Sequence, residues 1–402
     1  MTERSALARP RLWAARAGVA ERAIYTRHLR RLWLIPGTRL GLVAWPSSTA
    51  QRLHAHWNYW WQAHLLDTLV DAQLRFPTEN RKRDLARLVR GIHRRNFGHW
   101  LNDFYDDISW LGLALLRAEQ HAGVANPVAL REIADRLRSG WTDHGGGGIW
   151  WRRGADYKNV PANGPAAILL ARLSEHLVGD RVDRQRARSA VEWMEEYLVD
   201  ERTGLVWDGL HVAPDGTVRE VEHTVYTYCQ GVFLGACLDL AQLDGPGSGG
   251  WAKTVARTIG AVSAHLTVPD QHGQVLRGQG GGDGGLFGAI LARYLSLAAM
   301  RLPAMGVEFE LAAHTAADLV FASAEAAWQN RAIAPGGPLF GPEWTKPAVR
   351  PGRARRPERD LSVQAGGWML MEAAAALERE GMDARPGTPE SGFKDPDSRL
   401  LK

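Results

Sequence analysis

One kind of segment recurs six times along this chain of 402 residues, and it limits the fold more than any other feature. Each copy begins with polar or glycine residues and continues into small and medium-sized apolar residues at helical spacing. The six copies are residues 57–73, 106–120, 163–176, 228–243, 285–300 and 364–377. Because apolar residues surround each of these helices, we expect all six to be buried.

A second helical pattern, more charged and more one-sided, alternates with the first. Its copies are residues 12–33, 83–97, 127–141, 182–200, 251–266 and 307–329. One-sided helices cover a core with their apolar face and leave the other face in water. Six inner and six outer helices in strict alternation predict an all-α fold, an (α/α)6 barrel, whose inner helices all begin at the same end.

This repeat overrides the two or three domains that length alone would allow. We predict a single domain over residues 1–380. Residues 381–402 contain three prolines and alternating charges, which predict a disordered tail. The Pro-, Gly- and Arg-rich residues 332–359 predict a long surface loop, in which residues 340–344 dock on the domain.

Two adjacent carboxylates, Asp106 and Asp107, open the second inner segment. Asp106 would cap the helix by accepting a first-turn N–H, and Asp107 would favour the positive end of the helix dipole. However, neighbouring carboxylates also disfavour each other's ionisation, and that cost suggests a chemical use. Taken alone, the pair leaves both interpretations open.

Other inner segments also begin with polar or aromatic groups. These are Asn58, Trp60, Trp61, His64, Asn163, Tyr228, Gln230, Asp283, Gln364 and Trp368. If the inner helices converge, these side chains surround one space with Asp106 and Asp107. Amides, carboxylates and tryptophan faces without a Cys/His cluster suit a hydroxyl-rich substrate, so we predict no metal and no cofactor. A pair of carboxylates is the minimum equipment for breaking a glycosidic bond.

The formal net charge of +5 is a modest excess, and much of it lies in local arginine runs. We assign these runs to solvated helix faces and loops. Aromatic residues are not interleaved with them as a base-stacking groove would require, so we predict no nucleic-acid partner. An anionic glycolipid partner stays open.

Cys229 and Cys237 lie eight residues apart on one predicted helix, about 12 Å at 1.5 Å per residue, so we expect both thiols to stay reduced. The N-terminal residues show no secretory signal. The longest early apolar patch is broken by Pro36 and Gly37, and we predict no integral membrane span. We therefore expect a cytoplasmic protein, with secretion or cell-envelope association as the alternative. The oligomeric state is not predicted.

Six motifs, in order, resemble those of glycoside hydrolase family 76, the endo-α-1,6-mannanases, over roughly residues 55–378. The motifs are Trp61-Gln62-Ala63-His64, Tyr105-Asp106-Asp107-Ile108-Ser109-Trp110, Gly147-Gly148-Ile149-Trp150-Trp151 with Lys158-Asn159 and Asn163-Gly164, Tyr228-Cys229-Gln230-Gly231, Gly282-Asp283-Gly284-Gly285-Leu286-Phe287, and Gln364-Ala365-Gly366-Gly367-Trp368-Met369.

The resemblance implies an (α/α)6 barrel and metal-free, retaining hydrolysis of α-1,6-linked mannose chains, from a mannose-containing polysaccharide or lipoglycan. It implies that Asp106 is the nucleophile and Asp107 the general acid/base. A retaining enzyme needs two carboxyl groups about 5 Å apart, one ionised and one protonated. The helix N-terminus would stabilise one carboxylate, and repulsion would keep the other protonated.

For substrate contacts we predict one set of residues around this pair. The set is Tyr105, Trp61, Trp150, Trp151, Asn163, Tyr228, Gln230, Asp283, Gln364 and Trp368. Within it, Asp283 has the alternative of a loop-shaping residue, and one of the tandem tryptophans is expected to pack below the other. We expect His64 to be a hydrogen-bonded core residue, and Asp67 and Asp71 to bond neighbouring helices.

Other functions compete with this hypothesis. Unsaturated-uronyl hydrolases and sugar epimerases share the fold class but use different residues, and a terpene cyclase would need a DDxxD metal site. A non-enzymatic alternative is a glycan-binding (α/α)6 protein that is catalytically inactive or has another specificity. Cleavage of α-1,6-mannan separates these alternatives.

Overall fold

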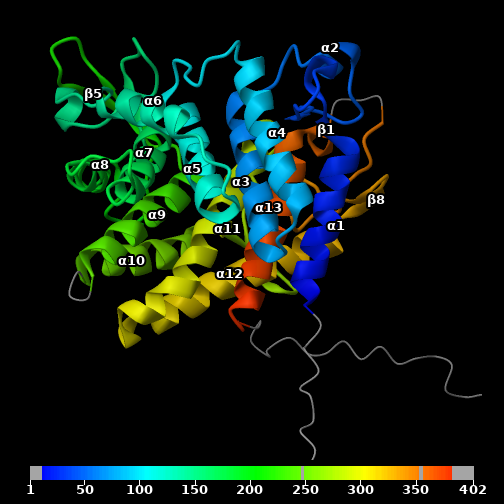
Figure 1. The fold of residues 1–402 in the computed structure, drawn as a ribbon. Coiled ribbons are helices and arrows are strands. Elements are labelled where there is room, and N and C mark those ends of the chain that lie inside the picture. Colours follow the sequence, from blue (N-terminus) through cyan, green and yellow to red (C-terminus); the bar gives the residue numbers. More distant parts are fainter. Residues whose placement is uncertain (1–10, 246–248, 353–355, 383–402) are drawn as a thin grey trace, which may run out of the picture.

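The computed structural model describes residues 11–245, 249–352 and 356–382. Six long helices, each buried on most of its circumference, form the inner layer (Figure 1). They are α3 (Tyr59–Arg75), α5 (Tyr105–Ala122), α7 (Val160–Leu173), α9 (Thr227–Asp244), α11 (Gly284–Arg301) and α13 (Leu361–Arg379). Each lies within a few residues of its predicted segment.

Six outer helices alternate with them along the chain. They are α1 (Leu12–Arg27), α4 (Glu79–Arg95), α6 (Pro127–Arg138), α8 (Asp183–Leu198), α10 (Gly249–His265) and α12 (Glu310–Gln329). In α4, for example, Leu85, Leu88, Val89 and Ile92 face the core, and arginines cover the other side. The charge pattern thus separates the two layers as predicted.

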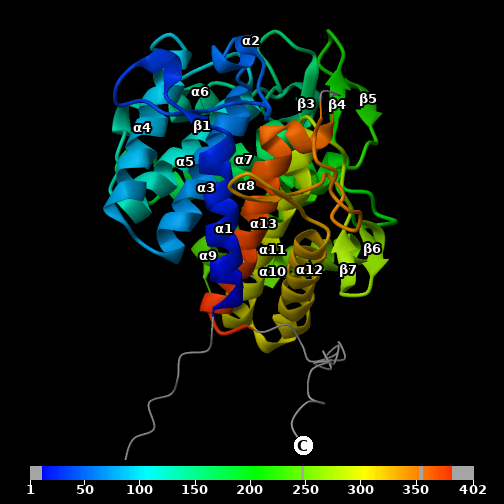
Figure 2. The ribbon, with the colours of Figure 1, turned by 90° about the vertical axis from the view of Figure 1, so that its right-hand side faces the viewer.

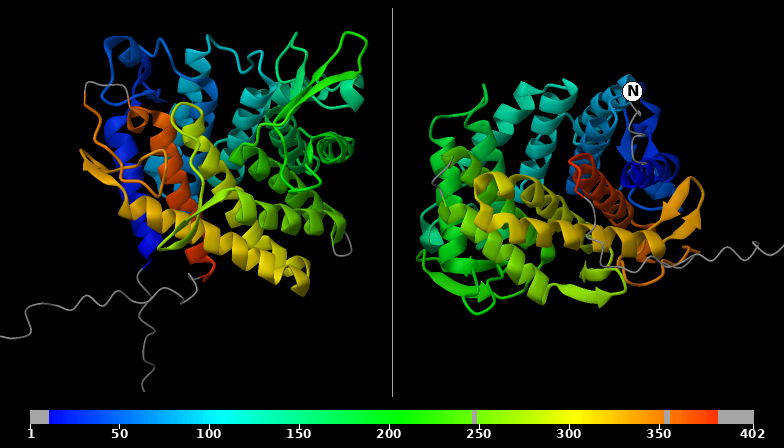
Figure 3. Two further views of the ribbon diagram at one scale, coloured as in Figure 1. Left: turned by 180° about the vertical axis from the view of Figure 1, so that it is seen from behind. Right: turned by 90° about the horizontal axis from the view of Figure 1, so that it is seen from below.

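The inner layer closes into a ring. Each inner helix packs on the next, from α3 through α5, α7, α9 and α11 to α13, and α13 packs again on α3. Figures 2 and 3 show the outer helices around this ring, with α1 and α12 beside α13. The predicted (α/α)6 barrel is therefore confirmed.

Close helix packing relies on glycine at one point of the ring. A Cβ on Gly366 of α13 would collide with the carbonyl oxygen of Gly285 in α11. Glycine costs about 1 kcal/mol relative to alanine inside a helix, and here it allows two backbones to approach directly.

Short strands and turns fill the connections, which the sequence patterns did not predict. They are β1 (Leu29–Arg30) with β2 (Leu40–Gly41), β3 (Tyr157–Asn159) with β4 (Gly209–Val212) and β5 (Val218–Glu222), β6 (Thr267–Asp270) with β7 (Gly273–Leu276), and β8 (Ala332–Ala334) with β9 (Gly337–Leu339), all antiparallel. The single-turn helices are α2 (Thr49–Arg52), η1 (Leu32–Leu34), η2 (His144–Gly146), η3 (Leu302–Met305), η4 (Val307–Phe309) and η5 (Pro357–Arg359).

Two predicted boundaries were wrong. The first outer helix ends at Arg27 and not near residue 33, because Leu29 and Arg30 pair with β2. The predicted loop at 332–359 contains the β8–β9 hairpin and η5, although Phe340 and Trp344 are buried, as expected. Most of the predicted tail, residues 383–402, lies outside the described residues.

The C-terminal ends of the inner helices meet in a network of ion pairs. Asp67 and Asp71 of α3 lie between Arg117 of α5 and Arg293 of α11, which confirms their predicted bonds to neighbouring helices. Asp239 of α9 likewise joins Arg172, at 2.7 Å, and Arg301, at 2.8 Å. Because a buried charge that loses its partner is strongly destabilising, these pairs fix the helices relative to one another.

Within the described residues, one segment, Gly284–Met305, is long and apolar enough to cross a bilayer by length and composition. It contains α11, an inner helix of the barrel, and 67% of that window is buried. Core helices commonly have this composition. The absence of an integral membrane span stays a prediction.

Candidate active site

The N-terminal ends of the inner helices meet at the end of the barrel opposite the ion pairs. Hydrogen bonds join the starts of several inner helices: Trp61 of α3 bonds Asp283, just before α11, Thr227 of α9 bonds Gln279, and Gly282 bonds Asp360, just before α13. The first turns of these helices therefore lie around one region, as predicted. Asp106 and Asp107 occupy the first turn of α5 there.

Asp106 is not the N-cap of α5. The N-cap residue is Phe104, which has no capping side chain, and Asn102 Oδ1 accepts the Phe104 N–H at 2.9 Å. Asp106 lies one residue inside the helix, where its Oδ1 accepts the Asp107 N–H at 2.9 Å. The capping interpretation is therefore wrong in position, but a first-turn N–H does bind the carboxylate.

Asp106 receives a second donor from a distant loop. The indole Nε1–H of Trp151 donates to Asp106 Oδ2 at 3.1 Å. Burial raises the pKa of Asp106 to about 6, the nearby Asp208 charge adds to the rise, and the two N–H donors oppose it. Asp106 is thus a carboxylate that ionises near neutral pH.

Asp107 has a more unfavourable environment for its charged form. Burial, the neighbouring Asp106 charge and the Asp283 charge raise its pKa well above the usual range, and the Asn102 amide, at 2.6 Å from Oδ2, only partly opposes them. The two adjacent carboxyl groups thus differ in pKa, and Asp107 is the one that keeps its proton. Such a division is what acid/base chemistry on one bond requires.

A third carboxylate, Asp208, was missed by the sequence analysis. It accepts the Tyr157 hydroxyl at 2.6 Å and faces the Cys229 thiol, and burial raises its pKa. Asp208 directly precedes β4, and β3 carries Tyr157, so the β3–β4 pairing brings both toward Asp106. No local sequence signal identifies Asp208, because this pairing joins segments about 50 residues apart.

Asp283 joins α11 to α3 at this end. It is exposed, and its Oδ1 accepts both the Trp61 indole N–H, at 2.8 Å, and the Trp60 indole N–H, at 3.1 Å. Its charge contributes to the raised pKa of Asp107, so it faces the carboxylate pair. Asp283 therefore orients two indole rings while leaving part of its own surface accessible.

Half-buried aromatic rings continue from Trp60. Tyr228 stacks on Phe287 with 4.0 Å between centroids and 14° between planes, and Phe287 also contacts Tyr226 and Trp60. Burial raises the pKa of Tyr228, and the nearby Asp106 charge adds to the rise, so Tyr228 lies near the pair. Trp60 was predicted to lie around this space, whereas Tyr226 and Phe287 were not, although Phe287 lies in one of the family motifs.

Three predicted substrate contacts instead hold the backbone. Asn163, Gln230 and Gln364 are 0–1% exposed. Together with Gln62, each is the fourth residue of an inner helix, and each bonds both the N–H and the C=O of a single residue at 2.7–3.1 Å. These backbone partners are Gly41, at the end of β2, for Gln62, and the loop residues Ile149 for Asn163, Val206 for Gln230 and Phe340 for Gln364. We call these four side chains the amide clamps.

Trp368 and Tyr105 also need correction. Trp368 is fully buried, and its indole N–H donates to Glu372 at 2.9 Å, so it belongs to the core of α13. Tyr105 is 7% exposed, and its ring lies where a side chain at Gly140 would be. Both were predicted in contact with substrate because their helices begin at the correct end, but their side chains point into the packing between helices.

The tandem tryptophans divide their roles. Trp151 contacts Asp106, whereas Trp150 covers the buried Lys158 ammonium group, 4.5 Å from its ring centroid. Lys158 donates to the carbonyls of Thr142, His144 and Gly147 and so fixes the glycine-rich loop. Burial lowers the Lys158 pKa to about 8.

His64 is buried as expected, but neither ring nitrogen has a hydrogen-bond partner among the residues that the structure describes. Its ring instead contacts Trp110, at 4.5 Å, and Trp60, at 5.4 Å. Burial keeps its pKa low, so it stays neutral. Both cysteines are free thiols, as predicted.

Within the described ranges, no group of three or more His, Cys, Asp or Glu residues is arranged to hold a metal ion. The prediction that the protein uses no metal and no cofactor is not tested by this observation.

Residues 36–376 match the family model of glycosyl hydrolase family 76. The chain belongs to this family. This match confirms the family resemblance noted in the motifs. Membership of the family supports glycosidase activity as the general class of reaction.

Solved structures agree over nearly the whole chain. An inactive variant of the α-1,6-mannanase GH76A of Salegentibacter sp. HEL1_6, with two consecutive aspartates replaced and in complex with α-1,6-mannotetrose, is 31% identical. That alignment covers 91% of this chain and 99% of the other, with a TM-score of 0.76. The Lin0763 protein of Listeria innocua is 27% identical, covering 92% and 98%, with a TM-score of 0.75.

A curated relative is the mannan endo-1,6-alpha-mannosidase DFG5 of Candida albicans, 26% identical over 216 residues. The match covers 47% of this chain and 46% of that protein, so it spans about half of each.

We expect Gln230→Leu to lower the free energy of unfolding by about 2–6 kcal/mol. It leaves the buried N–H and C=O of Val206 unpaired, at about 1–3 kcal/mol each. Urea unfolding measures the change. Unaltered stability together with weakened sugar binding would restore the original substrate-binding prediction.

Proposed function

We propose that this protein hydrolyses α-1,6-linked mannose chains with retention of configuration. The observation that carries the proposal is the pair of adjacent, unlike carboxyl groups: Asp106 ionises near neutral pH, and Asp107 is held protonated. The α-1,6-mannanase relative, inactive when two consecutive aspartates are replaced, supports both the substrate and the use of such a pair.

In the first step, the Asp106 carboxylate attacks the anomeric carbon while the bond to the leaving sugar oxygen breaks. Asp107 gives its proton to that oxygen, which leaves a glycosyl ester on Asp106. In the second step, Asp107, now a carboxylate, takes a proton from water. The water oxygen attacks the anomeric carbon, the ester breaks, and both side chains return to their starting states.

The surrounding residues support these two roles. Trp151 N–H and Asp107 N–H hold Asp106 in place and favour its ionised form, whereas the charge of Asp208 opposes ionisation. The exposed Asp283 and the half-buried Tyr228, with Phe287 behind it, offer a hydroxyl-binding carboxylate and an aromatic face for the sugar chain.

The same groups would also allow a glycan-binding protein without turnover, and cleavage of α-1,6-mannan decides between the two. The proposal does not define the compartment. The cytoplasmic location stays a prediction, as does the absence of nucleic-acid partners.

We expect Asp106→Asn and Asp107→Asn each to lower kcat on α-1,6-mannan at least about a thousandfold, because each removes a group that exchanges a bond or proton with substrate. Oligosaccharide release measures this, and circular dichroism checks the fold. Asp103→Asn is the matched control, since Asp103 is exposed three residues upstream. Turnover within tenfold of wild type in either variant would exclude the proposed pair.

We expect the acid limb of kcat/KM to lie near the Asp106 pKa of about 6, with activity falling as pH falls through it. Trp151→Phe removes an N–H donor to the ionised form, so this limb should move upward by about one pH unit. The pH profile of both proteins measures the shift. An unmoved or lowered limb would show that Trp151 does not stabilise the Asp106 carboxylate.

A further inference from the structure

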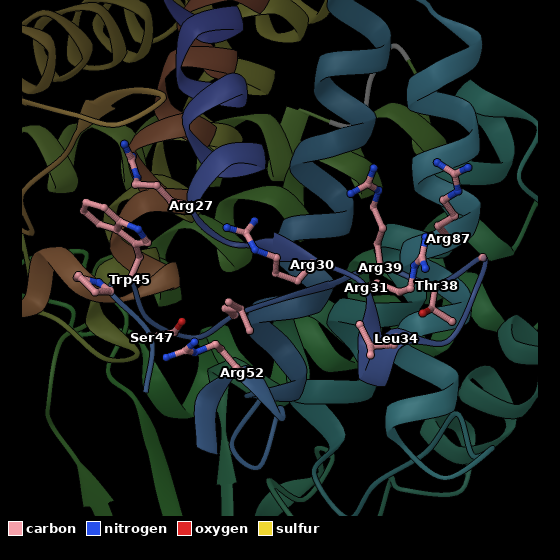
Figure 4. Close-up of a pocket in the computed structure, with 13 residues that line it drawn as sticks. Arg27, Arg30, Arg31, Leu34, Thr38, Arg39, Trp45, Ser47, Arg52 and Arg87 are labelled. Carbon is pink, nitrogen blue, oxygen red and sulfur yellow. The ribbon is translucent and has the colours of Figure 1, made fainter. Parts of the chain in front are cut away.

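A large groove, whose lining includes neither Asp106 nor Asp107, is formed mainly by the segment between α1 and α3, together with Arg27 of α1 and Arg87 of α4. It has a volume of about 860 Å³, and six of its thirteen lining residues are arginines (Figure 4). The six are Arg27, Arg30, Arg31, Arg39, Arg52 and Arg87, and no acidic residue of the described ranges lines the groove. We call this the arginine groove.

Few of these charges are neutralised. Asp84 pairs with Arg39, at 2.7 Å, and with Arg87, at 2.9 Å. Arg27 and Arg30 donate to neutral acceptors, mainly backbone carbonyls, which satisfy their N–H groups but leave the positive charge.

Arg31 and Arg52 are exposed, and neither side chain has a hydrogen bond or ion pair in the described part of the chain. Six guanidinium groups and one carboxylate, that of Asp84, give this groove an excess of positive charge as large as the +5 of the whole chain.

Beside the groove, four large apolar side chains face water. Trp33 is 42% exposed, Leu34 81%, Leu53 59% and Phe97 76%. They gather at one place: the Trp33 indole donates to the Leu53 carbonyl at 2.7 Å, and the Arg95 guanidinium contacts both the Trp33 and Phe97 rings. Leu34 also lines the arginine groove. We call these four residues the apolar tip.

The backbone of the apolar tip is unusual. Trp33, Leu34 and Phe97 all have positive φ, at 45°, 62° and 55°. Bulky L-residues rarely adopt this region, and an observed outlier of this kind suggests a functional constraint. Here the strained turns hold large apolar side chains outward, where they make little contact with the barrel core.

We propose that the arginine groove and the apolar tip together dock this protein on an anionic phospholipid surface. A soluble phosphorylated ligand or a nucleic acid would account for the arginines but not for four exposed apolar side chains. A lipid surface accounts for both, because arginines bind the lipid phosphates while apolar side chains enter the boundary between headgroups and acyl chains. Arginine also suits phosphate oxygens through its planar fork of donors.

Docking in this way would present the catalytic end of the barrel to the lipid surface. The segment after β2 lies against the start of α13, where Leu361 N–H bonds the Val43 carbonyl at 2.9 Å and Arg27 bonds Gln364 at 3.2 Å. Figures 1 and 2 show β1 and α2 together at this end of the molecule. A glycan carried by a lipid would then lie on the side of Asp106 and Asp107.

The test is co-sedimentation of the full chain with vesicles of phosphatidylglycerol and phosphatidylcholine, compared with vesicles of phosphatidylcholine alone. We expect binding only to the anionic vesicles, weakening with salt. The double variant R31Q/R52Q should bind about 25-fold more weakly, since each basic residue near an anionic surface contributes about fivefold. Leu34→Asn should weaken binding severalfold, and Asn tolerates the positive φ of Leu34.

Matched controls keep this test specific. R131Q/R202Q removes two exposed arginines elsewhere, and Leu177→Asn changes a leucine that is 98% exposed on another loop. Both should bind like wild type, with melting temperatures checked for every variant. Equal binding to neutral vesicles, or wild-type binding by R31Q/R52Q, would overturn the proposal.

Binding of inorganic pyrophosphate to the groove without vesicle binding would also overturn it in favour of a soluble ligand. Because binding is read without turnover, failure of the proposed hydrolysis would not affect the result.

Discussion

The amide clamps tie the loops at the catalytic end to the inner helices, and the geometry of the site depends on them. Each clamp pairs the N–H and C=O of one loop residue that would otherwise be buried without partners. Asn163 holds Ile149, two residues before Trp151, and Gln230 holds Val206, two residues before Asp208. Trp151 and Asp208, which act on Asp106 from other loops, are therefore positioned by Asn163 and Gln230. These two amide side chains bond the backbone of the loops and not Asp106 itself.

The unlike environments of Asp106 and Asp107 follow from this positioning. Burial raises the pKa of both, so the difference between them comes from their partners. Asp106 accepts a first-turn N–H and the Trp151 indole N–H, whereas Asp107 faces two other carboxylates and has a single amide donor. If Asp106 served only to cap the start of α5, the N–H donor from the Trp151 loop would not be needed.

The sequence was sufficient for the features that depend on local pattern. Apolar residues around α5 and a one-sided charge pattern on α4 distinguish inner from outer helices without any tertiary information, and the family motifs include Asp106 and Asp107. The sequence was insufficient for contacts whose partners come from distant segments of the chain. Asp208 reaches the site through the β3–β4 pairing, and α1 ends early because Leu29 pairs with Gly41. An amide such as Gln230 looks the same in sequence whether it binds a sugar or Val206.

The central claim is that Asp106 and Asp107 act as nucleophile and acid/base in a retaining hydrolysis. Proton NMR of the first product released from an α-1,6-mannan oligosaccharide tests it most directly, because the anomeric configuration is read before mutarotation. The account predicts that the α-anomer appears first and the β-anomer grows in later. A β-anomer formed first would mean direct attack by water and would contradict the account.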